Sequence, residues 1–212
     1  GIFRKMSKMP QVFWEWAFVQ RANFIRKMMD NQKMDEREIY LGFTRHTPAM
    51  VTNGPAGLNA SIKGFGFVPR QEYIEKVTSA LNSEIEEKES KPLKALWDNI
   101  YSPEASKNID RTRLISLELA RKHTFENVSP GKTQCTLIYY QPPMVSFEVR
   151  GEVELACDDK IIDFANAIHD VYHKRPKGSK KNLAYTFFIR EVFDNSVSSF
   201  GKRLDEGLED NC

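Results

Sequence analysis

The stretch from Thr133 to Leu155, TQCTLIYYQPPMVSFEVRGEVEL, decides the fold that the sequence predicts. In its second half apolar side chains fall on one face of an extended chain and polar side chains on the other, which is typical of a half-buried strand. Pro142-Pro143 separates this half from an equally β-rich first half, so two adjacent strands are predicted. Gly151 falls on the apolar face, where a missing side chain indicates a bulge, a bend or the close approach of another backbone or a ligand.

The composition narrows the class of protein. The chain has 212 residues, 41% of them hydrophobic, which suffices for one domain with its own core. The 31 basic and 29 acidic residues leave a formal charge of +2, which predicts binding neither to nucleic acid nor to an anionic membrane surface. No apolar run reaches the roughly 18 to 20 residues of a membrane span. Three cysteines without a CxxC spacing favour reduced structural thiols, and hence a cytoplasmic protein.

Upstream of this stretch the pattern predicts a helix and a second hairpin. Apolar residues at helical spacing predict an amphipathic helix over residues 10–32, rich in aromatic side chains. Such a helix suits the open end of a barrel or a second subunit, although packing within the same chain is the commoner outcome. Residues 39–52 and 58–68 are predicted to be extended, and the turn sequence NGPAG at 53–57 joins them.

Residues 70–110 change to helical spacing and are interpreted as a helical insertion. A first helix follows Pro69 and ends in a charged run, and Pro92 opens a short second helix. Residues 102–110 are predicted to form a polar loop.

The remaining elements complete one domain over residues 1–212. Residues 111–128 fit either an extended segment that turns helical or a continuous helix. Asp158 and Asp159 give an acidic first turn to a helix that reaches Tyr172. A basic turn at 174–181, a final strand at 185–192 and a loose acidic tail at 204–212 follow.

A phosphate site is the best-supported chemistry in the sequence. Ser61 and Lys63 lie two residues apart and therefore on the same side of one strand, where a hydroxyl and an ammonium group can hold one phosphate. Gly64 and Gly66 would let backbone amides approach the same phosphate. The alternative is an ordinary polar strand that faces solvent.

A second group of donors precedes the central hairpin. Lys122, His123, Thr124 and Asn127 could close over a phosphate or over the polar edge of a planar cofactor. Thr124 and Asn127 are equally common as capping and turn residues. Arg150, on the polar face of the second central strand, could contact an anion or pair with an acid on a neighbouring strand.

Two histidines raise the question of a metal. His169 and His173 are spaced i,i+4 on a predicted helix, so both could bind one ion. The segment HDVYH lacks the glutamate that a zinc peptidase helix uses as its base, and no third ligand stands out. The sequence therefore predicts no metal site, and a metal-dependent hydrolase remains only a third alternative.

The order of elements resembles the FMN-binding split barrel of the pyridoxamine 5′-phosphate oxidase-like superfamily. The similar segments are a strand with a glycine-containing turn, a second strand with a serine and a basic residue, and a strand pair with a Val-x-Gly pattern. They lie at residues 51–54 (VTNG), 61–65 (SIKGF), 124–127, 137–140 (LIYY) and 149–153 (VRGEV).

This resemblance implies an α+β fold that is mainly antiparallel: a six-stranded split β-barrel with flanking helices and a helical insertion. It also implies a homodimer that binds FMN and acts as an oxidoreductase on a small-molecule substrate, without an assignable catalytic residue. The implied cofactor-binding residues are Ser61, Lys63, Gly64, Lys122, His123, Thr124, Asn127 and Arg150. The alternative is a non-catalytic module for haem, a deazaflavin or a nucleotide, in which His123, His169 or His173 would matter most for haem.

Overall fold

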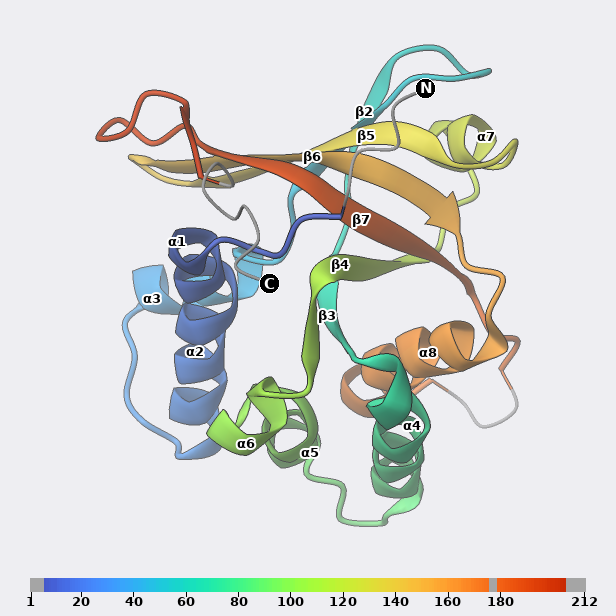
Figure 1. Cartoon of the computed structure of the whole chain (residues 1–212). Helices are drawn as coiled ribbons and strands as arrows, with labels where there is room; N and C mark the ends of the chain where they lie inside the picture. Colours follow the sequence, from blue (N-terminus) through green and yellow to red (C-terminus); the bar gives the residue numbers. More distant parts are fainter. Residues whose placement is uncertain (1–5, 176–178, 205–212) are drawn as a thin grey trace, which may run out of the picture.

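A computed structural model of the chain describes residues 6–175 and 179–204. An antiparallel sheet forms one layer, and helices cover one of its faces (Figure 1). The strand order is β2-β1-β5-β6-β7-β4-β3, with a short β8 beside β7, and the path that begins at β2 and ends at β3 is not closed. The strands are β1 (Ala49–Thr52), β2 (Asn59–Ile62), β3 (Gly66–Pro69), β4 (Ile109–Glu118), β5 (Thr133–Gln141), β6 (Val145–Leu155), β7 (Leu183–Asp194) and β8 (Lys202–Arg203).

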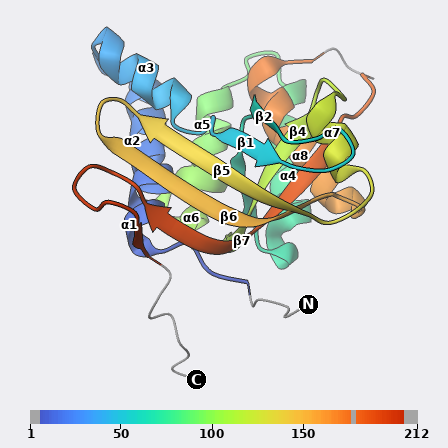
Figure 2. The same cartoon turned by 90° about the horizontal axis from the view of Figure 1, so that it is seen from above.

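The helices lie mainly on the covered face, except for the short α7, which lies beside the β1–β2 hairpin (Figure 1). They are α1 (Gln11–Trp14), the π-helical η1 (Glu15–Val19), α2 (Gln20–Met29), α3 (Glu36–Thr44), α4 (Gln71–Glu86), α5 (Pro92–Leu96), the π-helical η2 (Trp97–Tyr101), α6 (Pro103–Ser106), α7 (His123–Val128) and α8 (Asp159–His173). Seen from above, β1, β5, β6 and β7 lie side by side over them (Figure 2). None of the helices within the described ranges combines the length and the apolar content needed to span a bilayer.

The predicted class, α+β with a mainly antiparallel sheet and flanking helices, is confirmed, although the sheet has eight strands and not six. Part of the difference lies in residues 58–68, which form two strands and not one. β2 pairs with β1 in the predicted hairpin, while β3 pairs with β4 at the other end of the sheet. Between the two strands the buried side chain of Phe65 enters the core. The backbone N–H of Phe65 donates to the His46 carbonyl at 2.9 Å.

The central hairpin matches its prediction closely. β5 and β6 pair from Thr133 with Val153 to Gln141 with Val145. The register between β6 and β7 shifts at Gly151, which confirms the predicted bulge. A Cβ atom added there would overlap the carbonyl oxygen of Phe188 on β7, so the close approach of another backbone requires a glycine at this position.

Residues 39–44 were predicted to be extended, and this is wrong: they belong to α3. The Asp35 carboxylate caps this helix by accepting a hydrogen bond from the Glu38 N–H at 2.7 Å. Tertiary contacts support it, because Gly42 packs closely on the Phe24 ring and Phe43 meets the same ring edge-on at 5.3 Å. The extended prediction holds only from Ala49 onward.

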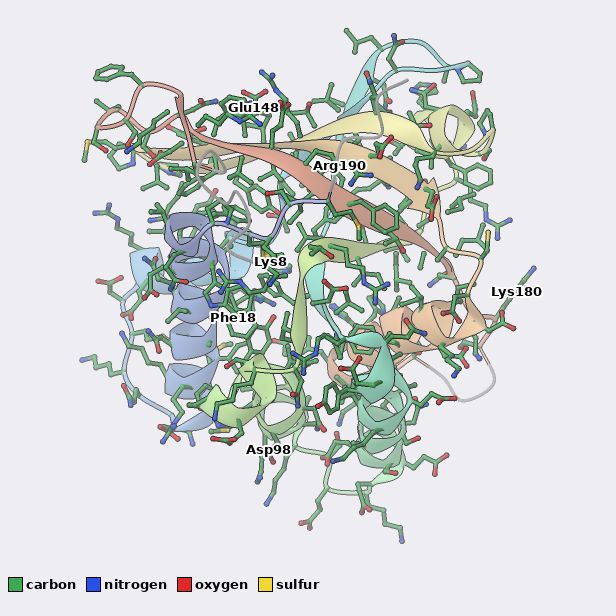
Figure 3. The ribbon with its side chains drawn as sticks, in the orientation of Figure 1. Lys8, Phe18, Asp98, Glu148, Lys180 and Arg190 are labelled. Atoms are coloured by element: carbon green, nitrogen blue, oxygen red, sulfur yellow. The ribbon has the colours of Figure 1, made fainter. Side chains whose placement is uncertain are left out.

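The helix predicted over residues 10–32 is confirmed as α1, η1 and α2. Its aromatic side chains pack within the same chain: Phe13 is fully buried and its ring meets Tyr139 and Phe147 at 5.3 and 5.4 Å. Figure 3 shows Phe18 turned into the interior from the same segment, whereas Asp98 points away from the body of the protein.

The helical character predicted for residues 70–110 is confirmed by α4, α5, η2 and α6. The polar loop predicted at 102–110 is wrong, because the Ser102 hydroxyl caps α6 by accepting from the Ala105 N–H and β4 already begins at Ile109. For residues 111–128 the extended segment that turns helical is the correct alternative.

Near the C-terminus, the predicted helix is confirmed as α8 and the strand predicted at 185–192 as β7, although the short β8 follows it. The acidic tail from residue 205 and residues 176–178 of the basic turn lie outside the described residues.

Candidate functional site

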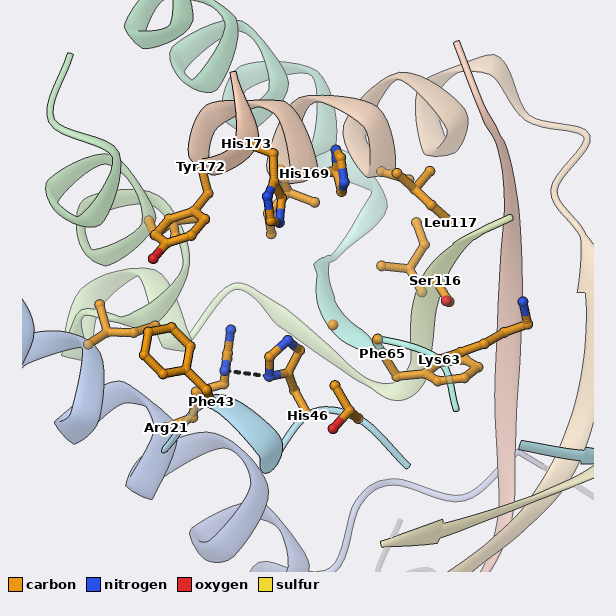
Figure 4. A pocket seen from close by; sticks show the side chains of 18 of the residues that line it. Arg21, Phe43, His46, Lys63, Phe65, Ser116, Leu117, His169, Tyr172 and His173 are labelled. Carbon is orange, nitrogen blue, oxygen red and sulfur yellow. Dashed lines mark hydrogen bonds between the residues drawn. The ribbon is translucent and has the colours of Figure 1, made fainter. Parts of the chain in front are cut away.

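A cavity of about 620 Å³ lies between the helices, residues 62–66 that connect β2 to β3, and strand β4. Figure 4 shows three sides of it. Helix α8 contributes His169, Tyr172 and His173, the facing side carries Arg21, Phe43 and His46, and Lys63, Phe65, Ser116 and Leu117 form the third. This volume falls within the range of small-molecule and cofactor sites.

Most of the cavity wall is apolar. Helices α2, α3, α5 and α8 supply many of these side chains and β4 adds two, and together they include Phe24, Ile25, Met28, Phe43, Leu96, Ile115, Leu117 and Ile168. Two further apolar side chains, Ile62 and Leu119, line the cavity while they remain 69% and 64% exposed, so the rim is also apolar. Such walls suit the body of a largely apolar or aromatic ligand, and the few polar groups would fix its orientation.

Lys63 lines the cavity, but its charge already has a partner. The ammonium group lies 3.1 Å from the Glu118 carboxylate, and the two side chains are 12% and 1% exposed. The other carboxylate oxygen of Glu118 accepts from the Ala120 and Arg121 N–H groups at 2.7 and 2.6 Å, and Tyr185 donates its hydroxyl beside Lys63. Burial alone raises the pKa of Glu118, but these hydrogen bonds and the Lys63 charge hold it below its usual value.

The Ser61 side chain points toward α7 and not toward Glu118. Its hydroxyl lies 2.9 Å from that of Thr124, which also accepts from the Asn59 amide at 3.1 Å. Asn127 is 1% exposed; its side chain accepts from the Ala56 N–H at 2.8 Å and donates to the Gly57 carbonyl at 2.8 Å. Thr124 and Asn127 therefore tie the β1–β2 turn to α7.

The eight residues predicted to bind the cofactor do not gather at one point. Lys63 and Gly64 line the cavity, and Ser61, Thr124 and Asn127 form the network just described. The side chains of Lys122 and His123 are exposed and outside the cavity lining. Arg150 is exposed, pairs with Glu148 and stacks on Phe193 with its guanidinium carbon 4.5 Å from the ring centroid. Figure 3 places Glu148 on the sheet face away from the helices.

The sequence patterns did not predict Arg21 and His46, a polar pair on the side of the cavity that faces α8 (Figure 4). Arg21 donates from one terminal nitrogen to Nδ1 of His46 at 2.8 Å and from Nε to the Tyr101 hydroxyl at 2.8 Å. Burial, the charge of Arg21 and nearby His173 lower the pKa of His46 to about 3, so its ring is neutral. A signal existed: Arg21 occupies the same helical face as Ile25 and Met28, at i, i+4 and i+7.

His169 and His173 lie side by side in the α8 wall, with ring centroids 4.5 Å apart. Nδ1 of His169 lies 3.0 Å from the Asp170 carboxylate, which also binds Arg175. Burial and the neighbouring His169 lower the pKa of His173, against the opposing effect of Asp170. Within the described residues, histidine, cysteine and acidic side chains form no group of three that could hold a metal ion.

No protein-family model matches the chain, and no curated protein matches it in sequence. Similar solved structures include HupZ from Group A Streptococcus, with 10% identity, coverage of 80% of this chain and 98% of that chain, and a TM-score of 0.45. A Clostridium acetobutylicum protein related to general stress protein 26 of B. subtilis has 9% identity, coverage of 83% and 90%, and a TM-score of 0.42. An FMN-binding protein from Syntrophomonas wolfei has 11% identity, coverage of 84% and 88%, and a TM-score of 0.35. The second of these is described as belonging to the pyridoxinephosphate oxidase family, the kind of protein that the sequence motifs resemble.

Proposed function

We propose that the chain binds FMN in the cavity between α2, α8, residues 62–66 and β4, and acts as an oxidoreductase of the pyridoxamine 5′-phosphate oxidase-like type on a small-molecule substrate. One observation carries the proposal: a cavity of about 620 Å³ with apolar walls that contains the guanidinium group of Arg21. FMN combines a planar aromatic ring system with one strongly anionic end. Apolar walls with a cation at one side fit both parts.

The polar groups of the chain meet the needs of such a ligand. Arg21 supplies positive charge, and Gly64 leaves room for a ligand beside its backbone, because a Cβ atom there would have only His46 within 4 Å. Ser61 on β2 and Thr124 on α7 hold their hydroxyl groups 2.9 Å apart. When bound, the flavin would supply the redox chemistry, while these residues bind it, orient it and exclude water.

A homodimer is part of the proposal. The exposed rim residues Ile62 and Leu119 continue the apolar cavity wall outward, and Leu58 nearby on the same hairpin is 77% exposed. A second subunit over this rim would bury these side chains and close the site. A cytoplasmic location is also proposed, supported by the free thiols of Cys135 and Cys157.

Haem is the second candidate ligand, and a specific observation favours it. The imidazoles of His169 and His173 both face the cavity, and a lowered pKa keeps His173 in the neutral form that binds iron. In that case the chain would be a cofactor-binding module and not a flavoenzyme.

The test is the absorbance spectrum of the purified protein before and after addition of FMN or hemin. We expect a flavin band that bleaches with dithionite or NAD(P)H, and mass spectrometry should identify FMN among the molecules released by heat. A protein that remains colourless and does not bind added FMN would refute the flavin proposal. A Soret band that is lost in His173→Ala and not in His123→Ala would establish haem, because His123 lies outside the cavity.

A further inference from the structure

Arg21 is a cation in the cavity wall that has no counter-ion in the part of the chain that the structure describes. Its two hydrogen-bond partners, the Tyr101 hydroxyl and the His46 ring, are both uncharged. No acidic side chain within the described residues lies within ion-pair distance of it, whereas Lys63, the other permanently charged side chain in the wall, pairs with Glu118 at 3.1 Å. A guanidinium that is half-buried among apolar side chains loses hydration, and an anion would restore a favourable partner.

Among the described residues, the surroundings of Arg21 add positive charge and no acidic partner. Arg45 is close enough that the charge of Arg21 contributes, after burial, to lowering its pKa. The ion pairs of the described chain leave Arg45 without an acid as well; one terminal nitrogen donates to the Gln141 side chain at 3.0 Å. Two neighbouring guanidinium groups without an acid repel each other, which raises the benefit of a bound anion.

His46 gives this end of the cavity a second donor. An arginine N–H can only donate, so Nδ1 of His46 accepts the 2.8 Å hydrogen bond and the ring proton resides on Nε2. Figure 4 shows the His46 ring beside Arg21 with the open space between them and the histidines of α8. The His46 N–H and the unused N–H groups of Arg21 can therefore bind the same oxyanion.

We propose that Arg21 and His46 form an anion subsite for a phosphate or carboxylate group whose apolar body fills the rest of the cavity. Identification of this anion as the flavin phosphate rests on the proposed function, but the subsite itself does not. It differs from the Ser61–Lys63 phosphate site that the sequence predicts, because Glu118 already neutralises Lys63.

Inorganic phosphate is the first probe. Thermal unfolding is measured with phosphate replacing chloride at constant ionic strength, for the wild type, Arg21→Gln and Arg37→Gln. Arg37 is an exposed arginine on α3 and serves as the matched control. We expect phosphate to raise the Tm of the wild type and Arg37→Gln and to have no such effect on Arg21→Gln. Equal shifts in all three proteins would overturn the proposal.

A measurement on the wild type alone covers the case in which Arg21→Gln does not fold. Phosphate should shift the proton resonance on Cε1 of His46 and leave that of the exposed His123 in place. An unmoved His46 resonance would count against the subsite.

Flavins then identify the ligand. If the phosphate of FMN occupies the subsite, the wild type should prefer FMN over riboflavin by about 10- to 100-fold, and Arg21→Gln should lose most of that preference while it binds riboflavin as before. Equal binding of the two flavins by the wild type, or loss of the preference in Lys63→Met and not in Arg21→Gln, would overturn the assignment but leave FMN binding intact. If neither flavin binds, the proposed function fails and the phosphate measurements alone decide on the subsite.

Discussion

The variant Lys63→Met tests whether Lys63 stabilises the fold through its ion pair with Glu118 or is available to bind a ligand. The Lys63 and Glu118 side chains are only 12% and 1% exposed, so Lys63→Met leaves a buried carboxylate without its cation. Loss of one partner of a buried pair costs about 3 to 5 kcal/mol. Glu118 keeps its hydrogen bonds from Ala120, Arg121 and Tyr185, and methionine preserves most of the packed stem. We therefore expect the free energy of unfolding to fall by about 3 kcal/mol.

A double-mutant cycle with Glu118→Gln tests the same reasoning. In the single variant Glu118→Gln, the new amide group faces the Lys63 ammonium, so this variant should also lose about 3 kcal/mol. In the double variant the glutamine oxygen can keep the two backbone N–H groups, and its NH₂ group can donate to the Tyr185 oxygen. The double variant should therefore be more stable than either single variant.

Urea unfolding followed by tryptophan fluorescence at neutral pH measures all four proteins. The interaction free energy from the cycle should exceed about 2 kcal/mol. A Lys63→Met variant within about 0.5 kcal/mol of the wild type, or a double variant whose loss equals the sum of the single losses, would refute the structural role. The Lys63 ammonium would then be available for a ligand.

Two further predictions concern stability. Gly151→Ala should destabilise the fold by about 1 to 3 kcal/mol or prevent folding, because its Cβ atom would overlap the backbone of β7. The control Gly66→Ala has open space around its Cβ atom and should have nearly the stability of the wild type. Equal urea midpoints for the two variants would contradict this prediction. His46 has its folded-state pKa lowered from 6.5 to about 3, so the unfolded chain binds its proton first and the stability contribution is lost as the pH falls from 6.5 toward 3. Between about pH 7.5 and 5.5 this loss is about 1.4 kcal/mol, and His46→Gln should lack it; an unchanged pH dependence in that variant would show that the lost stability has another origin.

The elements that sequence patterns predict correctly are those whose signal is local and long. Period-2 alternation over eleven residues specifies β6, and helical spacing over sixteen and fifteen residues specifies α4 and α8. The helix at Glu36–Thr44 was missed although the Asp35 cap was visible in the sequence, because β-branched and aromatic residues nearby suggested a strand. The division of residues 58–68 has no local signal, since it depends on Phe65 entering a core built by distant elements.

The candidate site was predicted less completely than the fold. Period-2 geometry predicts Ser61 and Lys63 on one side of a strand, but β2 ends at Ile62 and the two side chains have different partners, Thr124 and Glu118. Glu118 is 55 residues away from Lys63 in the sequence, however, so its neutralising charge could not be anticipated. Arg21 could have been identified from the sequence as a charged residue on an apolar helical face. Arg26 on the same helix, in contrast, is exposed and pairs with Asp30.

The position of Glu118 decides which cation in the cavity wall remains free for a ligand. Glu118 accepts four hydrogen bonds, one of them from Lys63. If Lys63 bound a phosphate instead, the deeply buried Glu118 carboxylate would lose its cation. A dianion beside Lys63 would also lie close to this negative charge, whereas at Arg21 it would meet cations, a neutral imidazole and the Tyr101 hydroxyl, and no acidic side chain of the described residues pairs with Arg21. Lys63 therefore has an acid as its partner, whereas Arg21 on α2 pairs with no acidic side chain of the described residues.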